Sequence, residues 1–134
     1  MGIRIISFRG QRVDSVEWVY GYYVKSVNDK SYIIIACTED DVTTKNEVDF
    51  IYIEVKPETL GQFTGLKDKE GTKIFEGDIV DTASGEKWKV DWFMDYASFS
   101  LLDTEGARHA LQFNLVCKVI GNKTDNPNLL EESK

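Results

Sequence analysis

The sequence predicts an all-β protein, with an N-terminal antiparallel β subdomain, a C-terminal small SH3-like barrel and few short helical turns. Three observations lead to this class. Apolar and polar residues alternate over short stretches, as in Trp88–Trp92, with the period of a half-buried strand. Turn-forming residues separate these stretches at roughly ten-residue spacing, which is typical of small barrels and sandwiches. No stretch keeps a helical period over the length of a normal helix.

The glycine-rich segment from Pro57 to Val80 organises the chain. It contains four of the ten glycines. Because glycine adopts positive φ angles at little steric cost, these positions indicate where the backbone turns. We expect a connection, then a turn over residues 67–71, then one strand from Thr72 to Asp81. The segment therefore separates an N-terminal β subdomain, residues 1–65, from the barrel, residues 66–123.

Short strands are expected on both sides of this segment. Before it lie Ile3–Phe8, which residues 9–12 interrupt, the aromatic strand Glu17–Val24, the apolar run Tyr32–Cys37, which looks buried on both faces, and Phe50–Val55. Within the aromatic strand, Gly21 indicates a bulge or a close backbone approach. After the segment lie Trp88–Trp92, Ser98–Leu102, Arg108–Leu111 and Cys117–Ile120. Residues 124–134 form a tail in which Asn126 and Pro127 favour one helical turn.

Composition narrows the cellular setting. The formal net charge is −7 and the pI about 4.7, so the overall field repels phosphate and argues against a general affinity for nucleic acid, although a local basic patch stays open. No run approaches the roughly 20 apolar residues of a membrane span, and the first residues lack the apolar core of a signal peptide. We therefore expect a cytoplasmic protein without membrane contact. Cys37 and Cys117 are expected to be free buried thiols, with a single disulfide as the alternative.

Three blocks of residues resemble the YopX family of phage and prophage proteins. They are Arg9–Asp14 with Glu17–Val24, the segment Pro57–Val80, and Val119–Asn122 with Asp125–Leu130. The blocks span nearly the whole chain, so residues 1–134 are identified as a single YopX-like unit. The resemblance implies a β-rich protein encoded on bacteriophage or prophage genomes and acting in the bacterial cytoplasm. It transfers no catalytic or binding residue.

Aromatic side chains are the candidate binding residues. Trp18, Tyr20 and Tyr22 share one face of their strand at a period of two, and Trp88 and Trp92 share one face of theirs. Such rings serve as stacking platforms for nucleobases or as anchors for a protein partner. The alternative is that they are core residues or cross-strand pairs, which is the common role of an aromatic stripe with this period.

The sequence offers two possible catalytic groupings, and neither is a strong indication of catalysis. Glu76 and Asp78 would share one face of the expected strand, where two carboxylates can hold Mg²⁺ or divide acid and base roles. Solvated surface carboxylates are the simpler interpretation. His109 could activate Cys37 or Cys117, but both cysteines flank aliphatic residues rather than an electropositive site. We therefore predict no catalytic residue, no metal and no cofactor.

These observations together indicate a non-enzymatic accessory protein. Its β surface would bind another bacterial or phage protein, or a second copy of itself. Two alternatives stay open, a nucleic-acid-binding small barrel and a metal-assisted hydrolase that uses Glu76 and Asp78.

Overall fold

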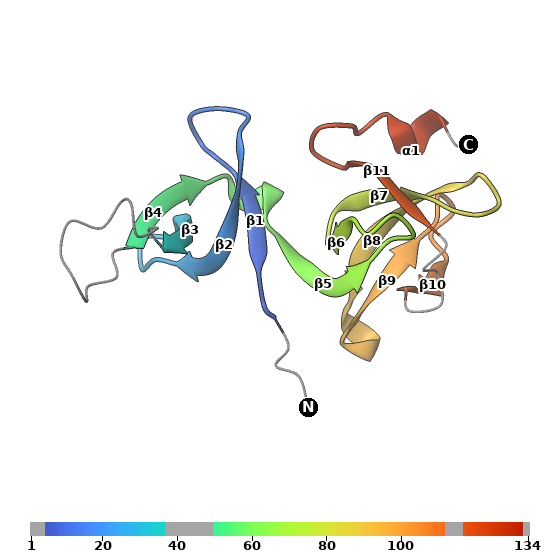
Figure 1. Ribbon diagram of the computed structural model, residues 1–134, viewed down its shortest axis with the longest axis horizontal. Helices are drawn as coiled ribbons and strands as arrows, with labels where there is room; N and C mark the ends of the chain where they lie inside the picture. The colour runs from blue at the N-terminus through green and yellow to red at the C-terminus, as the bar shows by residue number, and fades with distance from the viewer. Residues whose placement is uncertain (1–4, 37–49, 112–116, 133–134) are drawn as a thin grey trace. The chain divides into compact units, whose positions relative to one another are not determined.

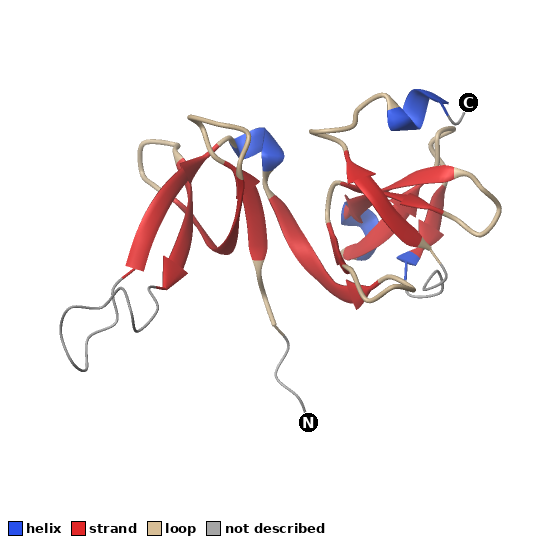
Figure 2. Ribbon diagram, turned by 45° about the horizontal axis from the view of Figure 1, so that its top comes forward, coloured by secondary structure: helices blue, strands red, loops and turns tan. Residues whose placement is uncertain are grey.

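The computed structural model describes residues 5–36, 50–111 and 117–132 of the chain. Its regular structure is mostly β-strand, in two antiparallel sheets (Figures 1 and 2). The strands are β1 (Phe8–Gln11), β2 (Trp18–Lys25), β3 (Ser31–Ala36), β4 (Phe50–Val55), β5 (Gly61–Lys67), β6 (Lys73–Phe75), β7 (Asp78–Asp81), β8 (Lys87–Phe93), β9 (Ser98–Leu102), β10 (Arg108–Ala110) and β11 (Lys118–Asn122). The helical turns are η2 (Pro57–Thr59), η3 (Met94–Tyr96) and α1 (Leu129–Glu132). The all-β class is therefore confirmed.

The chain divides into two compact units, Ile5–Gln62 and a second unit that starts at Phe63. The division lies inside β5, close to the boundary that the sequence predicts after Gly65. The first two residues of β5 pair with β1, and from Phe63 onward β5 pairs with β6. The β5–β6 register shifts between Phe63 and Lys67, and Gly65 within this interval has a φ of 89°. A residue with a side chain would be strained there.

The first sheet is six-stranded and antiparallel, in the order β4-β3-β2-β1-β5-β6, and the N-terminal unit contains β4 to β1 with the first two residues of β5. The buried core of this unit comprises Val19, Ile33 and Val55. At one end the residues that follow β1 and β4 meet. The backbone N–H of Lys56 donates to the carbonyl of Gln11 at 2.8 Å, and Arg12 bridges to Val55. β4 pairs with β3 along its whole length and, apart from this single bridge, with no other described strand, so the sheet is not closed.

The first strand differs from its prediction. Residues 9–11, expected to interrupt the strand, belong to β1, whereas the described residues before Phe8 are not strand. The reason is tertiary, because β1 pairs with β2 on one side and β5 on the other. Gly10 marks close packing, since a Cβ added there would lie 2.9 Å from the side chain of Val55.

Two further expectations concern β2 and β3. A Cβ added at Gly21 would overlap the carbonyl oxygen of Ile34, which confirms the close backbone approach. Ile33 is fully buried, but Tyr32 and Ile34 on the other face of β3 are half-buried. The run is therefore not buried on both faces, and Cys37 lies outside the described residues.

The C-terminal unit contains a five-stranded antiparallel sheet in the order β10-β9-β8-β7-β11. Its core gathers side chains of one sheet face together with residues of β6 and the connections, and comprises Ile74, Val80, Val90, Leu101, Leu111 and Cys117. Among the described strands, β10 and β11 each pair with one neighbour, so this sheet is not closed either. Asn126 accepts a hydrogen bond from the backbone of Leu129 at the start of α1, which confirms the helical turn in the tail.

The expected single strand from Thr72 to Asp81 is wrong, because it divides into β6 and β7. Gly77, between them, has a φ of 92°. The carboxylate of Asp78 accepts a hydrogen bond from the backbone N–H of Phe75 at 2.8 Å and closes the turn. A glycine with positive φ and a turn-forming aspartate together end the first strand and start the second.

Candidate functional site

One face of the N-terminal sheet carries exposed aromatic side chains. In β2 the buried and exposed positions alternate, so that Val19 faces the core while Tyr20 and Tyr22 point outward, 51% and 63% exposed. Tyr22 lies opposite Ile34, and Ile34 lies opposite Tyr52 in β4. Directly opposed residues share a sheet face, so the outward side chains of three strands lie on the same side.

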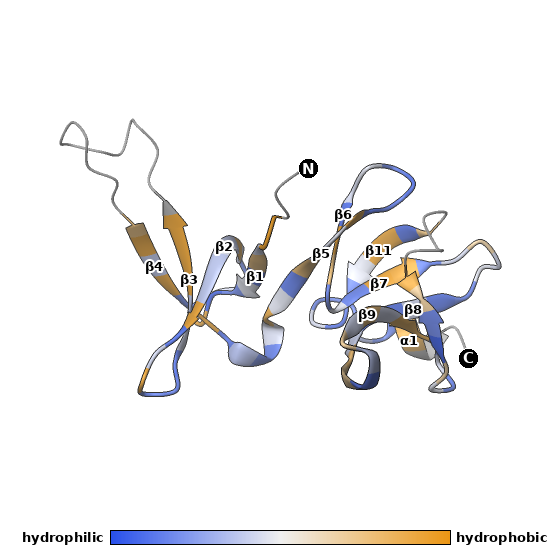
Figure 3. Cartoon of the chain, turned by 90° about the horizontal axis from the view of Figure 1, so that it is seen from below, coloured by the Kyte–Doolittle hydropathy of each residue, from blue (hydrophilic) through white to orange (hydrophobic). Residues whose placement is uncertain are grey.

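Tyr20, Tyr22, Phe50 and Tyr52 define what we term the aromatic face. Phe50 and Tyr52 are 52% and 62% exposed. Figure 3 shows that β3 and β4 consist mostly of hydrophobic residues. An aromatic side chain offers about 150–250 Å², so four rings at these exposures present roughly 450 Å². Contiguous apolar patches above a few hundred Å² are uncommon on monomers and frequently mark interaction sites.

Trp18 is less exposed than Tyr20 and Tyr22 on the same strand face. It is half-buried, and the guanidinium of Arg9 lies 5.0 Å from the centre of its ring. Arg9 itself is 7% exposed and lies opposite Tyr20 across the β1–β2 pair. A cation over an indole is a favourable contact that occupies one ring face. Trp18 therefore packs against Arg9 at the margin of the aromatic face and does not project from it as Tyr20 and Tyr22 do.

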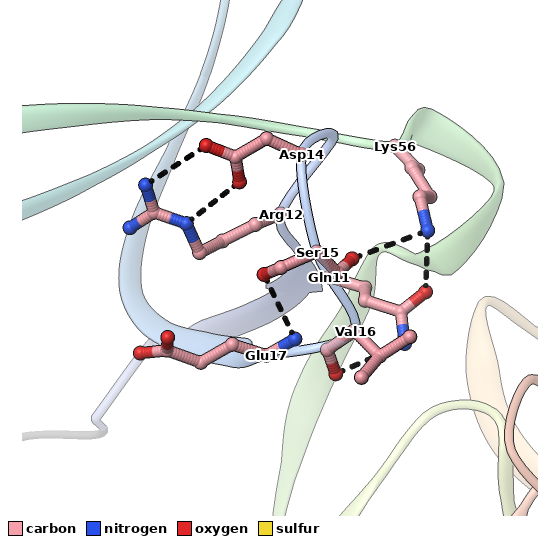
Figure 4. A network of polar contacts seen from close by, with 7 residues as sticks. All are labelled: Gln11, Arg12, Asp14, Ser15, Val16, Glu17 and Lys56. Carbon is pink, nitrogen blue, oxygen red and sulfur yellow. Dashed lines mark hydrogen bonds and ion pairs between the residues drawn. The ribbon is translucent and has the colours of Figure 1, made fainter.

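A polar network holds the β1–β2 connection and so fixes where β2 begins (Figure 4). The side-chain amide of Gln11 donates to the carbonyl of Val16 at 3.1 Å, and its oxygen accepts from Lys56 Nζ at 3.0 Å. Arg12 pairs with Asp14 at 2.9 Å. This hydrogen bond lowers the pKa of Asp14 and raises that of Arg12. These contacts link the connection to Lys56 at the end of β4 and thereby order both strands that carry the aromatic face.

The two tryptophans of β8 lie differently. Trp88 and Trp92 share their strand face with Val90, which is fully buried. Trp88 is half-buried against the C-terminal core, and Trp92, 37% exposed, makes an edge-to-face contact with Phe99 at 5.0 Å. Cross-strand aromatic packing of this kind stabilises a sheet. The structure therefore places both rings at the core and its margin.

His109 lies against Trp88 instead of a cysteine. The two rings stack 4.0 Å apart, and His109 Nε2 lies 3.0 Å from a carboxylate oxygen of Asp103. The hydrogen bond from His109 is the largest cause of the lowered pKa of Asp103, followed by a bond from the Ala107 backbone. Cys117 is a buried free thiol, and burial raises its pKa, which is the opposite of nucleophile activation.

The paired carboxylates do not share a strand face. Glu76 lies in the turn between β6 and β7, and Asp78, 1% exposed, accepts the hydrogen bond that closes that turn. The expected arrangement is wrong because the strand divides between them. Among residues 5–36, 50–111 and 117–132, no three His, Cys, Asp or Glu side chains gather where they could hold a metal ion.

Sequence reasoning missed three residues that the structure singles out. Phe50 and Tyr52 complete the aromatic face. Their alternation in the sequence predicts that they share one face of β4, but only the pairing of β4 with β3 shows that this is the face that carries Tyr22. Asp68 is 6% exposed, and its carboxylate accepts backbone hydrogen bonds from Glu70 and Val119, both at 2.9 Å. The position of Asp68 within the expected turn predicts the local bond from Glu70, but nothing in the sequence predicts the distant bond from Val119.

The fold and the site define a two-unit, all-β protein with an exposed aromatic sheet face in its N-terminal unit. The family model described as YopX protein matches residues 7–131, so the chain belongs to the YopX family, as its sequence predicts. It is also similar to a solved structure, the crystal structure of protein EF1440 from Enterococcus faecalis. The identity is 22% and the TM-score 0.57, over 94% of this chain and 98% of that one, a likeness that shows the fold. No curated protein matches the chain. Within the described ranges, no helix is long and apolar enough to cross a membrane.

Proposed function

We propose that this YopX-family member is a non-enzymatic accessory protein that binds another protein, or a second copy of itself, through the aromatic face. The observation that carries the proposal is the exposure of Tyr20, Tyr22, Phe50 and Tyr52 on one side of one sheet. Tyrosine is enriched at the energetic centres of protein interfaces, because its ring buries a large area while its hydroxyl can hydrogen-bond.

The size of the face fits this role. A standard interface buries about 800 Å² on each partner, and a little over half of that area is apolar. The roughly 450 Å² of aromatic surface estimated above matches that apolar share. The phage or prophage setting and the bacterial cytoplasm, which the family resemblance implies, belong to the same proposal. So does the description of the C-terminal unit as an SH3-like barrel, which rests on its short strands and the segment Glu76–Val80.

The test compares baits in capture experiments from host lysate. A double variant, Tyr20→Ser with Tyr22→Ser, removes two rings of the aromatic face, and Tyr96→Ser removes a ring of the C-terminal unit that is 78% exposed. Each hot-spot tyrosine is worth about 1–2 kcal/mol or more of binding free energy, so the double variant should lose its partner about 30-fold or more. A partner retained equally by both baits would refute the proposal.

Nucleic-acid binding is the second candidate, and the exposed rings of Tyr20 and Tyr22 favour it, because bases stack on such surfaces. Titration with single- and double-stranded oligonucleotides at two salt concentrations tests it. Binding that weakens steeply with salt and is lost in the double tyrosine variant would support this candidate. Flat isotherms at low salt would eliminate it.

A further inference from the structure

Among the described residues, the edge of β4 from Phe50 to Ile53 pairs with no strand other than β3, so it presents backbone groups as well as side chains. Along a strand, N–H and C=O groups point alternately to the two sides, and both groups of one residue point the same way. The carbonyl of Glu54 accepts from Val13, and the N–H of Lys56 donates to Gln11, so both residues point away from β3. The β3–β4 register continues without a shift to Phe50. The backbone groups of Tyr52 and Phe50 therefore also point outward.

This part of the edge carries none of the usual protective features. Natural edge strands are commonly protected by lysine, other charges, proline or bulges that discourage pairing with another chain. Phe50–Ile53 contains no charged residue and no proline, and Phe50, Ile51 and Tyr52 are each about half exposed or more. The other end of the same edge, from Glu54 to Lys56, is already paired with residues of the β1 end.

We propose that β4 pairs antiparallel with β4 of a second copy of this chain, about a two-fold axis at Ile51. The inference rests on the proposed function and names its partner. The register follows from the available groups. Centring the axis on Tyr52 would require Glu54, whose carbonyl already accepts from Val13. Centring it on Ile51 places Phe50 opposite Tyr52 of the second copy, and the outward groups of both residues form the hydrogen bonds.

The chemistry of the segment favours a second copy. Phe50, Ile51 and Tyr52 read aromatic, aliphatic, aromatic, so reversal of the strand places an aromatic ring opposite an aromatic ring. The aromatic face then continues across the axis. The three side chains expose about 300 Å² per copy, taking aromatic areas of about 150–250 Å². This is well below the roughly 800 Å² of a standard interface, so the dimer is weak and depends on concentration.

Sedimentation equilibrium over a range of concentrations, with matched variants, tests this pairing. Tyr52→Lys places a charge on the edge, and Tyr96→Lys makes the same change at an exposed tyrosine of the C-terminal unit, outside the aromatic face. Tyr52→Lys should raise the dimer Kd about tenfold or more, because it removes both cross-strand aromatic pairs. Tyr96→Lys should leave the Kd unchanged. Phe50→Lys provides a second edge variant, and circular dichroism checks that all three variants fold.

Tyr22→Lys, on the aromatic face but in the interior strand β2, distinguishes edge pairing from face-to-face packing. It should weaken the dimer less than Tyr52→Lys does, and equal weakening by the two variants would indicate that copies pack face to face. That result would overturn edge pairing and leave the proposed function standing. A wild-type chain that stays monomeric at every concentration would also overturn the pairing. The capture experiment tests the proposed function independently, so the failure of one proposal can be told from the failure of the other.

Hydrogen exchange gives a readout specific to the backbone. On raising the protein concentration, the amides of Phe50 and Tyr52 should gain protection, while those of Ile51 and Ile53 are protected throughout by β3. Protection of Phe50 and Tyr52 that is independent of concentration would contradict the pairing.

Discussion

Asp68 should be a main determinant of the stability of the C-terminal unit. Its carboxylate accepts hydrogen bonds at 2.9 Å from the backbone N–H groups of Glu70, Thr72 and Val119. The first two bonds close the β5–β6 turn, and the third ties that turn to β11. Replacing Asp68 with alanine leaves all three donors without this acceptor. A hydrogen bond to a charged group contributes about 1.5–3 kcal/mol.

The expected loss is smaller than three full bonds. All three bonds are partly buried, but Glu70 and Thr72 are exposed residues whose N–H groups water can reach in the variant, whereas Val119 is half-buried. We therefore expect Asp68→Ala to lower the free energy of unfolding by about 2–4 kcal/mol, out of the 5–15 kcal/mol typical of a domain. Glu70→Gln on the same turn is the control. Its 3.7 Å ion pair with Lys118 is exposed, so its effect should stay within about 0.5 kcal/mol.

Urea denaturation followed by tryptophan fluorescence measures this loss. In a Trp18→Phe background the remaining tryptophans, Trp88 and Trp92, both report on the C-terminal unit. A change below about 0.5 kcal/mol for Asp68→Ala would refute the assigned role, since that is the size of an ordinary surface effect.

The dependence on pH gives a second check. Burial alone would raise the pKa of Asp68, but the hydrogen bonds from Val119, Thr72 and Glu70, with the charge of Lys118, lower it below 3.8. A lowered folded-state pKa means that the carboxylate stabilises the fold above about pH 4 and that this contribution is lost as the pH falls through the folded-state value. Asp68→Asn should therefore flatten the acid limb of the stability curve. An acid limb identical to that of the wild type would contradict the reasoning.

Three further predictions concern other parts of the chain. Gly21→Ala should destabilise the N-terminal unit by about 3 kcal/mol, because the added methyl overlaps the carbonyl of Ile34; a loss below about 1 kcal/mol in urea titrations would contradict this. Cys117, in a variant whose other cysteine is replaced by serine, should react with a thiol reagent in urea but slowly in buffer, because it is buried with a raised pKa; fast labelling of the native chain would argue against this. His109→Ala should raise the pKa of Asp103 towards 3.8, as followed by NMR titration, and an unchanged value would show that the ring does not lower it.

Local patterns in the sequence predicted most of the strands, but not where every strand ends. The period of two located β2 and β8, and a glycine in β2 indicated its close approach to β3. The break at Gly77 was not predicted, because Ile74 and Phe75 on one side and Ile79 and Val80 on the other read as one β-rich run. What separates them is a positive φ and a side-chain hydrogen bond, and neither leaves a periodic signal.

The candidate site was predictable in part for a related reason. Tyr20 and Tyr22 were identified from their own strand, but which face they occupy depends on pairing. The same alternation in β8 points Trp88 and Trp92 towards the core, because β7 and β9 supply Val80 and Leu101 on that side. Periodicity predicts that residues share a face, and tertiary contacts decide whether that face is covered.

The composition of the strands explains why an apolar face is exposed in the N-terminal unit. In β8, lysine and aspartate occupy the positions between Trp88, Val90 and Trp92, so burying one face leaves a polar one. In β2 and β4 both sets of alternate positions are largely apolar, so when Val19 and Val55 enter the core, the tyrosines of the opposite face stay in contact with water. Exposed apolar area raises the free energy of the isolated chain by about 25 cal/mol per Å², and an interface that covers it recovers that energy. The excess of apolar residues over what one small core can bury is thus the physical basis for the association that we propose for this unit.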